Sequence, residues 1–113
     1  MHEYAVTKSI VEIAVAEAEK SGAKRINAIH LVIGDLASII DDSVRLYFDL
    51  IAAGTIAEGA RLEFKRVAAE FYCKQCRGNF IKPARGFDCP TCGGLGSPTD
   101  VGKEFYIESI EVE

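Results

Sequence analysis

The sequence predicts a small protein of mixed helices and strands that carries a metal-stabilised insertion. Of its 113 residues, 49% are apolar, which suffices for one modest core but not for two. Helix-like and strand-like patterns alternate up to about residue 70 and resume near residue 104. Between them, residues 71–102 contain all four cysteines and all three prolines. This composition is too loop-like to form its own apolar core, so we expect a bound metal to stabilise it.

Two segments have the spacing of amphipathic helices. Residues 3–20 place apolar side chains at helical intervals, and Gly22 follows where it can end a helix. Asp41 or Asp42 can cap a second helix, which Gly54 ends. The side chains expected to face the core are Val6, Ile10, Ile13 and Ala14 in the first helix, and Val44, Tyr47, Phe48 and Ile51 in the second.

Three segments have the composition of β-strands. Residues 25–33 are β-branched and are followed by Gly34, as expected of a well-buried strand. Residues 62–70 and 104–112 are also rich in strand formers, although the apolar alternation slips in both. His30 lies inside the first strand, where we expect it to be packed or hydrogen-bonded at the sheet.

The charge and the cysteine content restrict the class of protein. A net charge of −4 and a pI near 5.2 argue against a chain that mainly grips DNA or RNA through phosphate contacts. Charged residues interrupt the first twenty positions, so we expect neither a signal peptide nor a membrane span. A cytoplasmic, reduced protein is expected. In that compartment, paired cysteines are read as metal ligands before disulfides.

The cysteines form two close pairs, Cys73 with Cys76 and Cys89 with Cys92, separated by twelve residues. Two intervening residues let a tight turn present both thiolates of a pair to one ion, and zinc requires four tetrahedral ligands. With all four positions taken by thiolates, no site remains for water or substrate, so we expect a structural zinc. Redox dithiol or disulfide chemistry is the alternative. The glycines expected to relax these turns are Gly78, Gly93 and Gly94.

The same insertion is basic and aromatic. Lys74, Arg77, Lys82 and Arg85 occur with no acid before Asp88. The simpler interpretation is that they offset the negative charge of four thiolates. The other is a docking surface for an acidic partner or for nucleic acid. The aromatic residues that would contribute to such a surface are Phe71, Tyr72, Phe80 and Phe87.

The chain begins with Met1, His2 and Glu3. A bulky second residue disfavours removal of the initiator methionine, so we expect Met1 to keep a free α-amine. This amine, the backbone nitrogen of His2 and its imidazole Nδ1 can close two chelate rings in one plane, an arrangement that suits Ni(II) or Cu(II). The carboxylate of Glu3 could complete the set, and it also suits the positive end of a helix dipole. The alternative is that His2 is merely exposed.

Taken together, these motifs identify the chain as similar to the HypA/HybF family of hydrogenase maturation nickel metallochaperones. The resemblance rests on the opening Met1-His2-Glu3, on residues 33–36 after the first strand, on the turn at residues 54–60, and on the paired cysteines. It extends over the whole chain in order. One departure is that the cysteine insertion contains no histidine, whereas some relatives have one there.

The resemblance implies an α+β fold in which two helices pack on a three-stranded sheet, with a small zinc-ribbon domain inserted. Residues 1–70 and 103–113 would form the nickel-binding domain, and residues 71–102 the zinc domain between the second and third strands. Nickel would bind at Met1, His2 and Glu3, and zinc at the four cysteines. Ala69 and Gly102 lie near the linking segments, where small residues permit a hinge.

The resemblance also implies partners and a role. Nickel would be cargo, handed to the [NiFe]-hydrogenase large subunit with the help of a maturation GTPase, and in some organisms to urease maturation proteins. We expect no membrane and no nucleic-acid partner, no enzymatic activity, and either a monomer or a homodimer. The alternative function is a zinc-ribbon module that binds nucleic acid or an acidic protein partner.

Overall fold

The structure is a computed structural model that describes residues 2–113, with side chains from Glu3 onward. Two α-helices were predicted, and the described residues contain two. The elements are α1 (His2–Lys20), β1 (Ile26–Gly34), the 3-10 helix η1 (Asp35–Ala37), α2 (Asp41–Ala52), β2 (Arg61–Val67), β3 (Glu70–Cys73), β4 (Gly78–Ile81), β5 (Ser97–Pro98) and β6 (Phe105–Val112). No helix within residues 2–113 is both long and apolar enough to cross a membrane.

The described chain divides into two compact units. Unit 1 contains α1, most of β1, and the segments Ile39–Lys65 and Tyr106–Glu113. Unit 2 contains Ile33–Ser38 and Arg66–Phe105. We call residues 70–101 of unit 2 the cysteine module. The segments 33–38, 66–69 and 102–105, also in unit 2, we call the neck.

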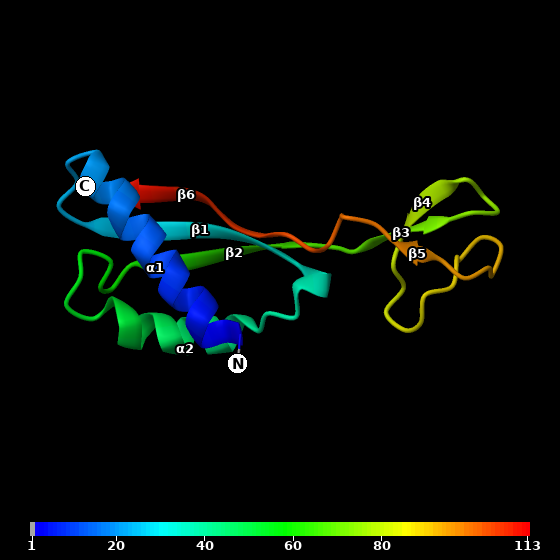
Figure 1. Ribbon diagram of the computed structural model, residues 1–113, viewed down its shortest axis with the longest axis horizontal. Helices are drawn as coiled ribbons and strands as arrows, with labels where there is room; N and C mark the ends of the chain where they lie inside the picture. Colours follow the sequence, from blue (N-terminus) through cyan, green and yellow to red (C-terminus); the bar gives the residue numbers. More distant parts are fainter. Residues whose placement is uncertain (1) are drawn as a thin grey trace. The chain divides into compact units, whose positions relative to one another are not determined.

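The predicted three-stranded sheet is confirmed, with β1 in the centre and β2 and β6 at the edges (Figure 1). Strands β1 and β6 run antiparallel, because the Glu113 amide donates to Arg25 at one end and the Gly34 amide donates to the Glu104 carbonyl at the other. Along β2, Leu62 is buried while its neighbours Arg61 and Glu63 are exposed. This alternation directs one face of the sheet to the core and the other to solvent.

The core lies between this sheet and the two helices. On α1 the buried stripe runs through Ile10, Val11, Ala14 and Ala18, whereas Ile13 is 54% exposed. The prediction that Ile13 faces the core is therefore wrong, because the stripe is centred one residue away. Thr7 was not predicted to be buried, yet its side chain is, and its hydroxyl donates to the carbonyl of Glu3 in the preceding turn. The other core residues include Ile26, Ile29, Leu31, Val44 and Phe48.

The start of α2 differs from the prediction. The helix begins at Asp41, and its N-cap is Ile40, which makes no side-chain cap. Neither Asp41 nor Asp42 is therefore the cap. Instead, the carboxylate of Glu3 on α1 accepts the amide of Ile40 at 3.3 Å. The two helices also meet through Tyr4 and Tyr47, whose rings pack edge to face with centroids 5.4 Å apart.

His30 is hydrogen-bonded at the sheet, as predicted. Its Nε2 lies 2.6 Å from Oε2 of Glu111 on β6. This hydrogen bond, together with the nearby guanidinium of Arg61, holds the pKa of Glu111 below its usual value. Nη2 of Arg61 lies 3.6 Å from Oε2 of Glu111 on the exposed face of the sheet, where such ion pairs contribute little to stability. His30 therefore has a structural role on this face.

The neck is a crossing of three backbone segments. Strand β2 ends at Val67, and β3 begins at Glu70, so the strand predicted over residues 62–70 is two strands with a break. The amide of Leu36 donates to the carbonyl of Gly102 at 2.7 Å. A Cβ on Gly34 would collide with the backbone of Gly102, and a Cβ on Gly102 would lie 2.7 Å from the Cα of Ala69. The glycines are therefore needed for close approach.

The cysteine module contains a three-stranded sheet of its own, in the order β4-β3-β5. β3 pairs antiparallel with both neighbours, with Phe71 opposite Phe80 on β4 and opposite Pro98 on β5. Phe71 is only 4% exposed, and the ring of Phe87 stacks on it at 5.4 Å. The expectation that this segment forms no apolar core is therefore wrong, because a small aromatic cluster forms beside the cysteines.

Candidate metal centre

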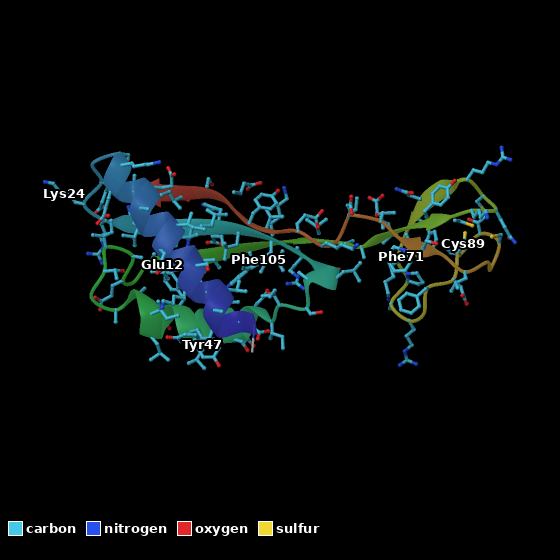
Figure 2. All side chains as sticks on the ribbon, viewed as in Figure 1. Glu12, Lys24, Tyr47, Phe71, Cys89 and Phe105 are labelled. Atoms are coloured by element: carbon cyan, nitrogen blue, oxygen red, sulfur yellow. The ribbon has the colours of Figure 1, made fainter. Side chains whose placement is uncertain are left out.

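The four cysteines meet at one end of the cysteine module (Figure 2, beside Cys89). Cys73 ends β3, where it is paired with Gly78, and Cys76 lies in the turn between β3 and β4. Cys89 and Cys92 lie in a second turn, bounded by the bridge between Asp88 and Leu95. Each pair therefore occupies a turn of its own.

The distances between the sulfur atoms fit a tetrahedral metal. All four Sγ atoms lie within 4.8 Å of one another. Cys73 and Cys92 are 3.4 Å apart, and Cys76 and Cys89 are 3.9 Å apart, measured between Sγ atoms. A zinc–sulfur bond of about 2.3 Å requires tetrahedral edges of roughly 3.8 Å. The cluster is thus compatible with a structural metal such as zinc.

Backbone amides point at the sulfur atoms and stabilise negative charge there. The Cys76 amide donates to Sγ of Cys73, and the Gly94 amide donates to Sγ of Cys92, both at 3.4 Å. Hydrogen bonds from the amides of Cys92 and Thr91 lower the pKa of Cys89 to about 6. Hydrogen bonding to Cys92 and Cys73 raises the pKa of Cys76 to about 12. Without a metal, the Cys76 thiol therefore retains a proton that a bound cation would displace.

The same backbone hydrogen bond occurs in both turns. The Arg77 amide donates to the Cys73 carbonyl and the Gly93 amide to the Cys89 carbonyl, each at 2.8 Å. Both donors have positive φ, 58° for Arg77 and 77° for Gly93. Gly78 was expected to relax the first turn, but the left-handed position falls on Arg77. The first turn is therefore strained where the second is not.

This difference predicts opposite responses to substitution. Gly93→Ala should weaken zinc binding about fivefold, because an alanine at positive φ costs about 1 kcal/mol and metal binding is coupled to folding of the turn. Arg77→Gly should not weaken it, because glycine removes the strain. Competition with a chromophoric chelator measures both affinities.

Arg77→Ala is the matched control for Arg77→Gly, since it removes the charge and keeps the strained backbone. It should bind zinc less tightly than Arg77→Gly does. Equal affinities for Gly93→Ala and the parent chain would contradict this account of the turns.

At the N-terminus, Met1 and the side chain of His2 lie outside the described residues. Glu3, the third predicted residue of this site, is half-buried in the first turn of α1. Its bond to the Ile40 amide joins the beginnings of both helices. No signal in the sequence pointed to Ile40, because the two residues are 37 positions apart and the donor is a backbone group.

The four basic residues of the insertion are not equivalent. Lys74, Arg77 and Arg85 are exposed, whereas Lys82 is half-buried. The ammonium of Lys82 donates to the Pro83 carbonyl at 3.0 Å and lies 5.1 Å from the centroid of Phe87. Lys82 thus adjoins the aromatic cluster.

Comparison with known proteins identifies the family. A family model described as "Hydrogenase/urease nickel incorporation, metallochaperone, hypA" matches residues 1–112. The chain belongs to the HypA family. This family serves nickel incorporation into hydrogenase and urease, which agrees with the resemblance inferred from the sequence.

Relatives in the HypA family extend over the whole chain. A protein named "Hydrogenase maturation factor HypA" from Caldanaerobacter subterraneus subsp. tengcongensis is 50% identical to this chain, and the alignment covers 100% of both chains. A protein of the same name from Dehalococcoides mccartyi is 43% identical, and the alignment covers 100% of this chain and 95% of that protein. The similarity therefore includes both the N-terminal helix and the cysteine pairs.

Two solved HypA structures share the fold. "Solution structure of HypA protein" matches with a TM-score of 0.71, and "Solution structure of the Ni metallochaperone HypA from Helicobacter pylori" with 0.66. Each is 24% identical; they cover 100% and 99% of this chain, respectively, and 97% of their own. At this identity the likeness concerns the fold alone.

Proposed function

We propose that the chain binds one Ni(II) ion reversibly at its N-terminus and delivers it for maturation of [NiFe]-hydrogenase. The proposed ligands are the α-amine of Met1 and two nitrogens of His2, the backbone nitrogen and the imidazole Nδ1, with Glu3 beside them. Membership of a nickel-incorporation family over residues 1–112 is the observation that carries this proposal. Because a carrier must release its cargo, the affinity for nickel should be modest, and copper should bind more tightly in vitro.

The start of α1 supports the use of a backbone nitrogen as a ligand. A metal-bound amide nitrogen loses its proton, which would disrupt a helix that needed the proton for a hydrogen bond. α1 begins at His2, and the first N–H groups of a helix have no acceptor within it. Nickel coordination there costs the helix none of its own hydrogen bonds.

Glu3 has a second role in this proposal. Its carboxylate lies in the first turn of α1 and accepts the amide that precedes α2, so it is held near the positive ends of both helices. This contact ties the N-terminal turn to the rest of unit 1. We propose that Glu3 thereby positions the nickel ligands, whether or not its carboxylate binds the metal directly.

The four-cysteine cluster is proposed to hold zinc. The donor set is four thiolates, and the sulfur separations are compatible with a zinc site that has no further ligand. Such a zinc would supply no catalytic water, and its contribution would be to fold the cysteine module. Cys73 and Cys89 are buried, whereas Cys76 and Cys92 are exposed at the rim.

The partners and the location follow from this role. We propose that the chain acts in the cytoplasm without catalysing a reaction, and that it works with a maturation GTPase and the [NiFe]-hydrogenase large subunit. Urease maturation proteins are further candidates, because the family description includes urease.

Nickel titration of the untagged, zinc-loaded protein tests the proposal. The parent chain should develop the visible absorption of a planar nickel centre at one equivalent. A version with two extra residues ahead of Met1 should lose this absorption, because the α-amine is moved out of reach. His2→Ala should lose it as well.

His30→Ala is the control for the loss of a histidine. His30 is bonded to Glu111 on the sheet, so its removal should leave nickel binding unchanged. Equal nickel binding by the extended and the parent protein, or loss of binding in His30→Ala, would show that the site has been placed wrongly.

A further inference from the structure

The cysteine module carries an apolar groove that neither metal site uses. It is lined by Phe71 from β3, by Pro98 from β5, and by Phe87, Leu95 and Gly96 from the segment between them. All five are apolar residues, and all belong to unit 2. The groove is therefore a feature of the module itself.

Two of the apolar side chains that line the groove are exposed to solvent. Phe71 forms the floor and is 4% exposed, but Phe87 is 49% exposed and Leu95 is 74% exposed. The stacking of Phe87 on Phe71, at 5.4 Å and 11°, already accounts for the cluster that stabilises the module. The exposed side chain of Leu95 has no such structural role, and paired apolar walls of this kind are typical of binding surfaces.

The groove is held open by the backbone. The amide of Gly96 donates to the Phe87 carbonyl at 2.9 Å, which fixes the two walls relative to each other. A side chain at Gly96 would collide with the ring of Phe80, so glycine is needed for this close approach. A preformed groove loses little conformational entropy when a ligand enters.

The segment that carries the groove is rich in basic residues. Lys82 lies over Phe87 with its ammonium 5.1 Å from the ring centroid, and Arg85 is exposed in the following loop. Residues 71–99 contain four basic side chains and one acid, Asp88, although the whole chain has a net charge of −4. A basic segment in an otherwise acidic protein favours an acidic ligand.

We propose that this groove binds an acidic protein segment that inserts one aromatic or branched aliphatic side chain between Phe87 and Leu95. Lys82 and Arg85 would pair with the carboxylates that flank the inserted side chain. Phe87 is the one exposed aromatic ring that lines the groove, whereas binding of nucleic acid by stacking uses several rings in succession. The proposal concerns a protein contact and is independent of nickel binding.

An NMR titration of the zinc-loaded full-length chain tests it. The probe is a blocked hexapeptide of glutamate and aspartate with one central phenylalanine. It should shift the amide signals of Phe87, Leu95 and Gly96 in a saturable way, with a Kd on the order of 0.1 mM. Replacing the phenylalanine by alanine, or the acids by lysine, should weaken binding at least tenfold.

Leu95→Ser is the decisive variant, because a side chain exposed to this degree can be changed without unfolding the module. This substitution should weaken binding of the acidic peptide at least fivefold. Tyr72→Ala is the matched control: Tyr72 is an exposed aromatic residue on β3 that does not line the groove, and its removal should leave the affinity unchanged.

Three results would overturn the proposal. The first is an absence of saturable shifts at the groove with the acidic phenylalanine peptide. The second is equal binding of the lysine peptide. The third is saturable binding of a thymidine oligonucleotide at these amides that Leu95→Ser abolishes, which would assign the groove to nucleic acid instead.

Discussion

Removing the metal from the four cysteines should unfold the cysteine module while α1 and α2 stay folded. In Cys89→Ser, or after treatment of the parent chain with a strong chelator, the NMR signals of residues 70–101 should collapse to unfolded positions. The helix signals of unit 1 should remain dispersed. The reason is that one aromatic cluster around Phe71 provides the little apolar burial the module has, whereas a structural zinc contributes about 10 kcal/mol or more.

Thr91→Ser is the control for this experiment, because Thr91 is an exposed residue in the same turn and its side chain is not a ligand. Its spectrum and zinc affinity should match those of the parent chain. A dispersed spectrum for residues 70–101 in the metal-free protein would mean that the aromatic cluster folds the module alone. That result would refute a structural role for the metal.

Substituting the neck glycines should produce the second large loss. Gly34→Ala places a Cβ against the backbone of Gly102, and both segments are fixed: the Gly34 amide binds the Glu104 carbonyl and the Leu36 amide binds the Gly102 carbonyl, each at 2.7 Å. Neither backbone can retreat without breaking these bonds. The free energy of unfolding should fall by about 3 kcal/mol or more.

Gly102→Ala should be comparably severe. Its Cβ would lie 2.7 Å from the Cα of Ala69, and its φ of 108° is unfavourable for alanine. Urea unfolding of the zinc-loaded chain measures both losses, and faster hydrogen exchange of the Leu36 amide would locate them in the neck.

Gly78→Ala is the matched control, because a Cβ there meets nothing within 4 Å and its φ is not positive. It should change the stability by less than about 1 kcal/mol. If Gly34→Ala were equally harmless, the close crossing of the neck segments would be wrong.

The glycine in the neck shows how a sequence pattern can be ambiguous. Small residues near Ala69 and Gly102 are compatible with a hinge, and composition alone does not distinguish a hinge from a close crossing. In the structure Gly102 is buried, its amide donates to Oε1 of Glu104 at 2.8 Å, and its carbonyl accepts the Leu36 amide. The position requires glycine because three segments meet there.

The sequence by itself determined most elements of unit 1 and the cysteine cluster, since both depend on local sequence patterns. Helical and strand periodicity, with Gly22 and Gly54 as stops, located α1, β1 and α2 within a few residues. Two residues between paired cysteines predicted two turns converging on one metal, and the four Sγ atoms do converge. The family was recognisable for the same reason, because its motifs are short and contiguous.

Only the tertiary structure decided which distant groups meet. Glu3 binds the amide of Ile40, His30 binds Glu111, and Gly34 crosses Gly102, yet each pair is separated by more than thirty residues. The apolar groove likewise depends on the register that sets Phe71 beside Pro98. Local propensity carries no information about such pairs, because they form only when packing and strand register bring the segments together.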